Sequence, residues 1–138
     1  ITTKNLNYIL KEARDQCSDT LKDMRIIHVL IDNYVIDNQK YNNFPQNLNC
    51  NHFSLDINFI CLPFNYLRNL ENIINKYQIS LNRLINKRYM EDHFFDEKMH
   101  LTEMARKIID GHNLNEVVLT SKKLKNVTFF EKFFHFFR

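Results

Sequence analysis

The sequence of 138 residues predicts an α+β fold: two helices packed on a small three-stranded sheet, followed by an extra helix, a linker and a C-terminal amphipathic helix. Three observations predict it. Apolar side chains recur at helical spacing in residues 2–16 and 65–77. They alternate with polar side chains from Phe53 to Cys61, as in a strand with one face on a core. They dominate the run from Ile26 to Ile31, as in a mostly buried strand.

The first elements are a helix and a buried strand. Thr2 or Thr3 can cap the helix, which is expected to end at about Gln16. Its apolar side chains make one stripe along the helix: Leu6, Ile9, Leu10, Ala13 and Cys17. The strand runs from Ile26 and is extended by Tyr34, Val35 and Ile36. The helix is therefore expected to cover a sheet that contains this strand.

The residues from 38 to 85 complete the first predicted domain, residues 1–85. Asn38 to Asn51 is rich in Asn and Gln and contains Pro45, which predicts a loop. The alternating strand Phe53 to Cys61 follows and is ended by Pro63, after which Asn65 can cap a second helix. That helix has one apolar stripe, formed by Leu67, Leu70, Ile73, Ile74 and Tyr77. A short third strand is predicted from Ile79, Leu81 and either Leu84 or Ile85.

Two further segments follow the first domain. Residues 86–126 are predicted to hold a helix, with Gly111 at its C-terminal cap, and a basic linker. The helix is marked by the spacing of Leu101, Met104, Ala105, Ile108 and Ile109. Residues 127–138 are predicted to form an amphipathic helix, because six of the twelve phenylalanines lie in the last ten residues.

Composition restricts the function. Gly111 is the single glycine, whereas loops that cradle phosphate need several, so a complete nucleotide site is not expected. The three cysteines form no CxxC pair and are odd in number, which favours reduced thiols in a cytoplasmic protein. No apolar run reaches the roughly 20 residues that span a bilayer. The chain starts at Ile1 and shows no secretory signal, so we expect a fragment with its front missing.

The net charge of +3 is unevenly placed. Residues 120–138 carry five basic side chains against one acidic side chain, whereas the rest of the chain has 14 basic and 15 acidic residues. This asymmetry predicts an anionic partner for the tail alone.

One segment resembles the bacterial cell-division protein FtsA, a member of the actin-like family. The residues that carry the resemblance are His28-Val29-Leu30, Tyr34-Val35-Ile36-Asp37-Asn38-Gln39, Asn43-Phe44-Pro45 and Leu48. The flanking helix, the strand from Phe53, the next helix and Ile79-Ser80-Leu81 are also similar, so the resemblance covers residues 1 to about 85. In FtsA this region is the insert subdomain. The family's opening strand would precede Ile1, and its glycines before the second strand are replaced by Asn47 and Asn49.

The resemblance implies a role in bacterial cell division. Intact members link the FtsZ ring to the cytoplasmic membrane, use ATP, and employ this subdomain for contacts with other division proteins or with FtsA subunits. The ATP-binding core and the FtsZ-binding domain have no counterpart here, so we expect no cofactor, no catalysis, and FtsZ as a partner of the intact protein only. Asp37 and Gln39 either satisfy the polar loop or contact a neighbouring protein.

FtsA also typically ends in a basic, aromatic helix that attaches to the cytoplasmic face of the inner membrane, and residues 127–138 look like that element. The side chains expected to meet anionic lipid are Phe129, Phe130, Phe133, Phe134, Phe136, Phe137, Lys132 and Arg138. Alternatively the same aromatic face docks on the protein's own sheet or on a partner chain. Nucleic acid is not an expected partner, because no basic groove is evident elsewhere.

Other functions remain open at this point. On one helix, His93, Glu97 and His100 would present three ligands to a metal ion, which predicts a small metal-binding domain or enzyme. A solvated helix face also explains these residues. A related pilus-assembly actin-like protein, or an unrelated peripheral membrane protein with a similar α+β module, is a further alternative.

Overall fold

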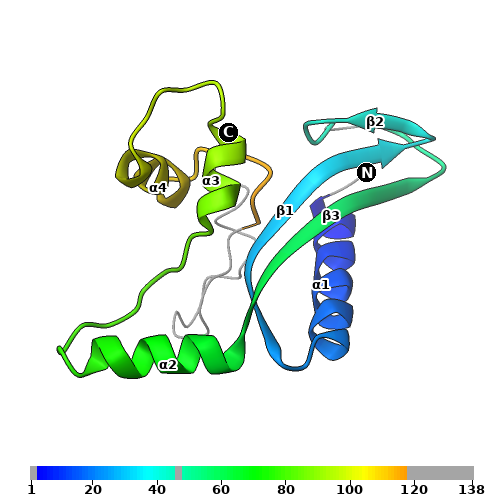
Figure 1. The fold of residues 1–138 in the computed structure, drawn as a ribbon. Coiled ribbons are helices and arrows are strands. Elements are labelled where there is room, and N and C mark those ends of the chain that lie inside the picture. The colour runs from blue at the N-terminus through cyan, green and yellow to red at the C-terminus, as the bar shows by residue number, and fades with distance from the viewer. Residues whose placement is uncertain (1–2, 46–47, 118–138) are drawn as a thin grey trace.

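The computed structural model describes residues 3–45 and 48–117, and within them it confirms the α+β class (Figure 1). Four helices accompany a three-stranded antiparallel sheet in this part of the chain. The elements are α1 (Thr3–Thr20), β1 (Met24–Ile36), β2 (Gln39–Tyr41), β3 (Phe53–Pro63), α2 (Phe64–Asn75), α3 (Lys87–His93) and α4 (Leu101–Ile109). The membrane-binding helix predicted for residues 127–138 and residues 118–126 of the predicted linker lie outside the described residues.

β1 is the central strand, with β3 on one side and β2 on the other. The hairpin from β1 to β2 turns through Asp37 and Asn38, whose φ angles of 45° and 68° suit a two-residue turn that follows the sheet twist. The carboxylate of Asp37 accepts the backbone N–H groups of Asn51 and His52 at 3.0 and 2.8 Å. Asp37 therefore satisfies the polar loop, which was one of its two expected roles.

Two bulges in β1 keep its apolar side chains on one face of the sheet. The register shifts between Ile26 and His28 and between Ile31 and Asn33, so β1 gains one residue at each place while β3 stays regular. The alternating side chains of β3 at positions 53, 55, 57, 59 and 61 consequently lie opposite Ile36, Tyr34, Ile31, Val29 and Ile26. All ten belong to the same face, as the period of two in β3 predicts.

α1 covers this face of the sheet. Leu6 and Leu10 from its predicted stripe are buried against Val29, Ile31 and Tyr34 of β1. Because α1 continues to Thr20, four residues beyond the predicted end, the whole stripe lies within the helix. The first core therefore forms between α1 and the sheet.

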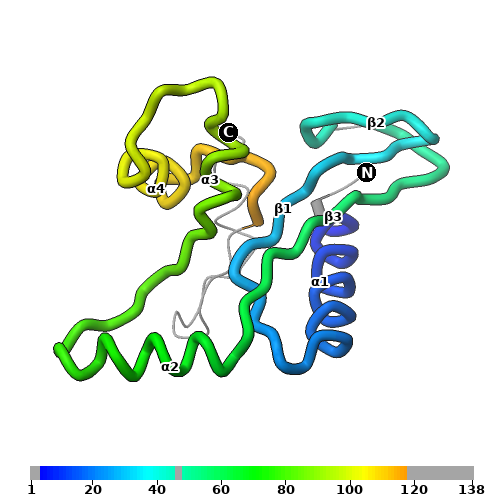
Figure 2. Tube along the Cα trace, in the orientation of Figure 1, coloured from blue at the N-terminus to red at the C-terminus, as the bar shows by residue number. Residues whose placement is uncertain are grey.

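α3 and α4 cover the opposite face, so the molecule has three layers in this region (Figures 1 and 2). Leu30 of β1 and Ile60 of β3 point to this side and meet a second group of buried side chains: Tyr89, Met90, Phe94, Met104 and Ile108. Gly111 follows α4 with a φ of 82°, which confirms it as the left-handed residue of the cap. The second core joins residues that are more than 50 positions apart.

Two element predictions were wrong, and one helix was missed. The third strand is not at Ile79 to Ile85, which is irregular in the described structure; it is β2, inside the predicted loop. α2 begins at Phe64 after Pro63 as N-cap, and Asn65 instead accepts a hydrogen bond from Arg68 within the first turn. The helix α3 was not predicted.

Candidate functional site

The most concentrated chemistry in the described residues is a buried polar cluster between the sheet and α3. His28 projects from β1, and Glu116 comes from a segment that pairs with the edge of β1 opposite Leu30. The backbone bonds Ile31 N to Asn115 O (2.9 Å) and Val117 N to Val29 O (2.8 Å) hold that segment on the sheet. His28 is 1% exposed and Glu116 is 6% exposed, so this pair has been removed from water.

The ring of His28 is held at both nitrogens. Its Nε2 lies 3.0 Å from the backbone nitrogen of Asn86, which can only donate, so Nε2 is the acceptor. The ring proton is therefore on Nδ1, which donates to Glu116 Oε1 at 2.8 Å. A histidine with both nitrogens engaged inside the protein has no free lone pair for a substrate proton. In this arrangement His28 positions the chain and does not act as a general base.

The carboxylate of Glu116 accepts hydrogen bonds from three side chains. Besides His28, Arg83 Nη2 donates to Oε1 at 3.1 Å and the Tyr89 hydroxyl donates to Oε2 at 2.9 Å. Burial alone raises the pKa of Glu116, but the hydrogen bonds from His28 and Tyr89 and the charge of Arg83 outweigh burial and hold the pKa below its usual value. The carboxylate stays charged and joins β1, residues 83–86 and α3.

The hydroxyl of Tyr89 also has hydrogen-bonding partners inside the protein. It accepts the Nδ2 amide of Asn113 at 2.9 Å while it donates to Glu116. Burial, together with the neighbouring Glu116 charge, raises the pKa of Tyr89 well above its usual value. Tyr89 therefore serves as a neutral hydrogen-bonding link and not as an acid.

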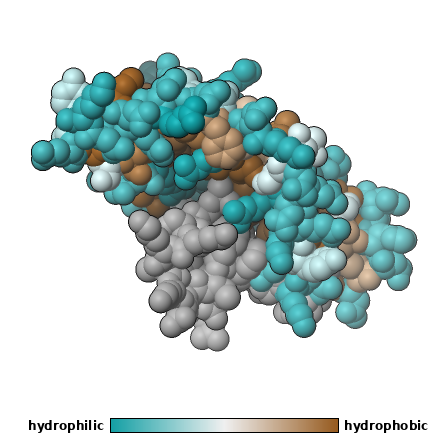
Figure 3. All heavy atoms as spheres, turned by 90° about the horizontal axis from the view of Figure 1, so that it is seen from below, coloured by the Kyte–Doolittle hydropathy of each residue, from teal (hydrophilic) through white to brown (hydrophobic). Residues whose placement is uncertain are grey.

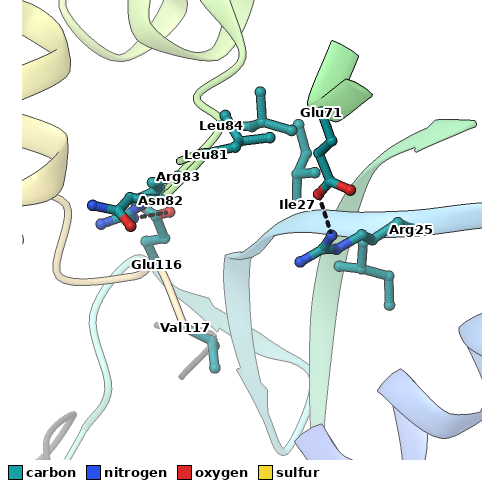
Figure 4. A pocket seen from close by; sticks show the side chains of 10 residues that line it. Arg25, Ile27, Glu71, Leu81, Asn82, Arg83, Leu84, Glu116 and Val117 are labelled. Atoms are coloured by element: carbon teal, nitrogen blue, oxygen red, sulfur yellow. Dashed lines mark hydrogen bonds and ion pairs between the residues drawn. The ribbon is translucent and has the colours of Figure 1, made fainter. Parts of the chain in front are cut away.

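A small cavity of about 180 Å³ lies beside this cluster (Figure 4). Two arginines line it, and each faces a carboxylate: Arg83 bonds Glu116, and Arg25 lies 3.7 Å from Glu71 of α2. Aliphatic side chains complete the lining, among them Ile27, Leu81 and Leu84. Since both cations already have internal partners, the cavity offers no uncompensated charge to an anionic ligand.

A wider open groove of about 730 Å³ runs between the sheet and α3. Its lining is rich in asparagine, and several of these amides bond within the protein: Asn115 Nδ2 donates to the carbonyl of Asn42 at 2.6 Å, and Asn115 N donates to Asn113 Oδ1 at 3.0 Å. This network fixes the chain before Glu116 and explains the density of asparagine there.

The predicted metal ligands are not brought together. His93 is the last residue of α3, Glu97 lies in the turn after it, and His100 is the N-cap of α4, so they do not share one helix. Glu97 pairs with Lys107 at 3.1 Å instead, and His93 meets His112 at 3.3 Å. Across residues 3–45 and 48–117 no group of three or more His, Cys, Asp or Glu side chains is arranged to hold a metal ion. The metal-site prediction was wrong because α3 ends at His93, and a turn separates this residue from Glu97 and His100.

The three cysteines are the other candidate nucleophiles in the described residues. All three are free thiols of intermediate exposure. Burial, with Cys17 close by, raises the pKa of Cys61 to about 11. Because the thiolate is the nucleophile, Cys61 is poorly suited to covalent catalysis near neutral pH.

The second notable feature is an exposed apolar surface on and beside α2, which we call the α2 surface. Its members are large apolar side chains that are each at least half exposed: Tyr66, Ile73, Tyr77 and Ile79. Leu67 is the buried side chain of this helix. The molecule seen from below also shows apolar side chains surfacing among polar ones (Figure 3). A group of this kind is typical of a contact with another macromolecule.

Sequence reasoning missed the polar cluster, although it left one signal. His28 interrupts the β-branched and aliphatic run from Ile26 to Ile31, and a polar residue inside a buried strand needs a partner. Nothing local identifies Glu116, 88 positions away, as that partner. The candidate lipid-binding residues Phe129, Phe130, Lys132, Phe133, Phe134, Phe136, Phe137 and Arg138 all lie outside the described residues.

No helix in the described residues has both the length and the apolar character needed to cross a bilayer. Comparisons with protein-family models, with curated proteins and with solved structures found no match to this chain.

Proposed function

We propose that this chain is a protein-interaction module of the bacterial division machinery, of the kind found in FtsA, and that its C-terminal residues bind anionic lipid at the cytoplasmic face of the inner membrane. The binding partners are other division proteins or FtsA subunits. Binding, and not catalysis, is its activity. Linking the FtsZ ring to the membrane belongs to the intact protein of that family.

The α2 surface is the observation that carries the proposal. Ile73 and Tyr77 are 55% and 73% exposed, although they continue the stripe that begins with the buried Leu67. Burying a side chain of this size contributes about 1.5 to 3 kcal/mol, so leaving several exposed is unfavourable unless another molecule covers them. A protein partner gains that free energy on binding.

The arrangement of the polar groups supports binding over catalysis. His28, Tyr89 and Glu116 are the most deeply buried titratable groups of the cluster, and each is satisfied by partners inside the chain. An acid–base site needs a group that reaches a substrate proton. Here the same groups fasten the segment from Arg83 to Val117 to the sheet.

The resemblance to FtsA adds the biological setting. The elements α1, β1, β3 and α2 follow one another in the order that the resemblance implies, but β2 is inserted between β1 and β3 and the strand expected at Ile79-Ser80-Leu81 is not formed. The aromatic and basic composition of residues 127–138 supports lipid binding, because each phenylalanine that leaves water contributes up to about 1.5 to 3 kcal/mol and each nearby cation about 1 kcal/mol against anionic lipid.

Liposome sedimentation tests the membrane part. We expect vesicles containing anionic phospholipid to pull down the full chain, and the double variant Phe130→Asp with Phe134→Asp to abolish binding. Salt is expected to weaken binding only in part, since it screens the lysines but not the apolar contribution.

The matched control is Ile73→Asp with Tyr77→Asp, which places the same two charges on the α2 surface. This control variant is expected to sediment with vesicles like the unmodified protein. Equal binding by the tail variant would refute the tail, and loss of binding by the control alone would assign lipid contact to the α2 surface.

A further inference from the structure

β3 occupies the edge of the sheet. In the described residues the strand order is β2-β1-β3, and β1 is the strand that pairs with β3. The other edge of β1 is paired twice, by β2 and by the segment around Glu116. The outer backbone groups of β3 thus run along an 11-residue strand without a partner strand in this part of the chain.

This edge lacks the usual protection against pairing. Natural edge strands are often short, bulged, or interrupted by proline and lysine. Both bulges of this sheet lie in β1, Pro63 is at the very end of β3, and β3 contains no lysine. Its one charged side chain, Asp56, leans toward the inner strands, where Lys40 and Asn33 each donate to its Oδ2 at 3.0 Å. These two hydrogen bonds lower the pKa of Asp56.

The apolar layer under the sheet is also incomplete at this edge. Val29, Ile31, Tyr34 and Ile36 of β1 are all buried. Their cross-strand neighbours in β3 are each only partly buried, although they are the same kind of side chain: Phe59, Ile57, Leu55 and Phe53. A further strand beside β3, carrying its own helix on the same face, would complete this layer.

We propose that the partner of this edge is β3 of a second copy of the chain, paired antiparallel about a two-fold axis at Ile57. A two-fold axis perpendicular to the sheet keeps each α1 on the same face. It also places the odd-numbered, apolar residues of both strands on that face. The result is one continuous sheet with the order β2-β1-β3-β3-β1-β2 and both α1 helices beneath it.

The charge pattern selects this register and this partner. With Ile57 opposite Ile57, Asp56 of each copy lies opposite Asn58 of the other, and Oδ1 of the carboxylate can accept the amide. A shift that centres the axis on Asp56 places two carboxylates opposite each other, which is unfavourable. The register centred on Ile57 is therefore self-complementary, whereas the register centred on Asp56 is not. Because this contact is small by the standards of specific interfaces, below about 1,200 Å², we expect a dimer of micromolar affinity.

Sedimentation velocity over a range of protein concentrations tests the proposal in lipid-free buffer. The unmodified chain is expected to shift from monomer to dimer as its concentration rises. Asn58→Asp places a charge against Asp56 twice per dimer and is expected to weaken the dimer about tenfold. Asn58→Lys creates two opposite-charge pairs and is expected to tighten the dimer several-fold.

Two controls keep the readout specific. Asn69→Asp makes the same charge change on the exposed surface of α2 and is expected to leave dimerisation unchanged. The variant Phe130→Asp with Phe134→Asp removes any association through the tail, so dimerisation through β3 is expected to persist in it. Asn58 is itself exposed, and its replacement is not expected to unfold the monomer.

Amide hydrogen exchange provides a second measurement. Exchange in β3 is expected to slow with rising concentration in the unmodified chain, and less so in Asn58→Asp. A chain that stays monomeric at all concentrations overturns the proposal and points to the edge being covered by residues 118–138 or by another protein. A dimer that responds to neither Asn58 variant overturns it as well.

Discussion

α1 and α2 carry the same kind of apolar stripe, but only in α1 is every residue of the stripe at least partly buried. Leu6 and Leu10 of α1 are 0% and 3% exposed. In α2 the stripe begins with Leu67 at 2% and continues to Ile73 at 55% and, just past the helix, Tyr77 at 73%. The difference teaches that periodicity identifies which side of a helix is apolar, whereas the neighbouring elements determine whether that side is buried.

The neighbours differ because of where each helix joins the sheet. α1 precedes β1 and returns on it through a short turn, closed by a hydrogen bond from Met24 N to Leu21 O. α2 starts at the end of β3, where Phe64 N bonds Asp23 O at 2.9 Å, and extends past the sheet (Figure 1). The face of the sheet opposite α1 is covered by α3 and α4 and not by α2.

The largest expected effect tests the covered helix. Leu6→Ala removes a fully buried side chain and leaves a space between α1 and β1, so the free energy of unfolding should fall by about 2 to 5 kcal/mol. Urea denaturation followed by circular dichroism measures it. Lys11→Ala, on the exposed side of α1, is the control and should change stability by less than about 0.5 kcal/mol. A small loss in Leu6→Ala would mean that α1 is not firmly attached to the sheet.

The parts of the fold that sequence predicts well are those with local causes. The stripe of α1, the period of two in β3 and the cap at Gly111 depend on residues a few positions apart, and each was confirmed. β2 was missed because it has only three residues, and its position depends on the turn at Asp37 and Asn38. The expected strand from Ile79 was wrong, because residues 79–86 are irregular although the outer edge of β3 has no partner strand in the described residues.

The polar cluster could not be predicted for a similar reason. His28 and Glu116 are brought together by the pairing of Leu30 with Glu116, and no pattern within either segment specifies that pairing. The metal prediction failed because it assumed one uninterrupted helix from His93 to His100. The lipid-binding residues of the tail and the division partners remain predictions.

The second expected effect tests what holds α3 and α4 on the sheet face that α2 does not cover. Glu116→Gln removes the charge that Arg83, His28 and Tyr89 contact and is expected to lower stability by about 1 to 3 kcal/mol at pH 7. The pKa of Glu116 is depressed in the folded chain. Its contribution is therefore fully present above the unfolded-state pKa, near 4.5, and is lost as the pH falls through the lower folded-state pKa.

Denaturation curves of both proteins from pH 7 to pH 3 measure this contribution. The stability difference between the unmodified chain and Glu116→Gln should shrink steadily below the ordinary carboxyl pKa, while the other carboxylates affect both proteins equally. A difference that stays constant with pH would show that the charge of Glu116 does not stabilise the fold.

The smallest expected effect tests the exposed helix and is the sharpest check on the comparison. Ile73→Ala deletes an apolar side chain from the same kind of stripe as Leu6→Ala, but at a half-exposed position, so stability should change by less than about 0.5 kcal/mol. The same urea denaturation measures it at two protein concentrations.

A loss of 2 kcal/mol or more would contradict the exposed position of Ile73. If that loss grew with protein concentration, a second copy would be the cover, because only association makes stability depend on concentration. If the loss of stability did not depend on protein concentration, other residues of the same chain would cover Ile73. The stripes of α1 and α2 would then no longer differ in burial.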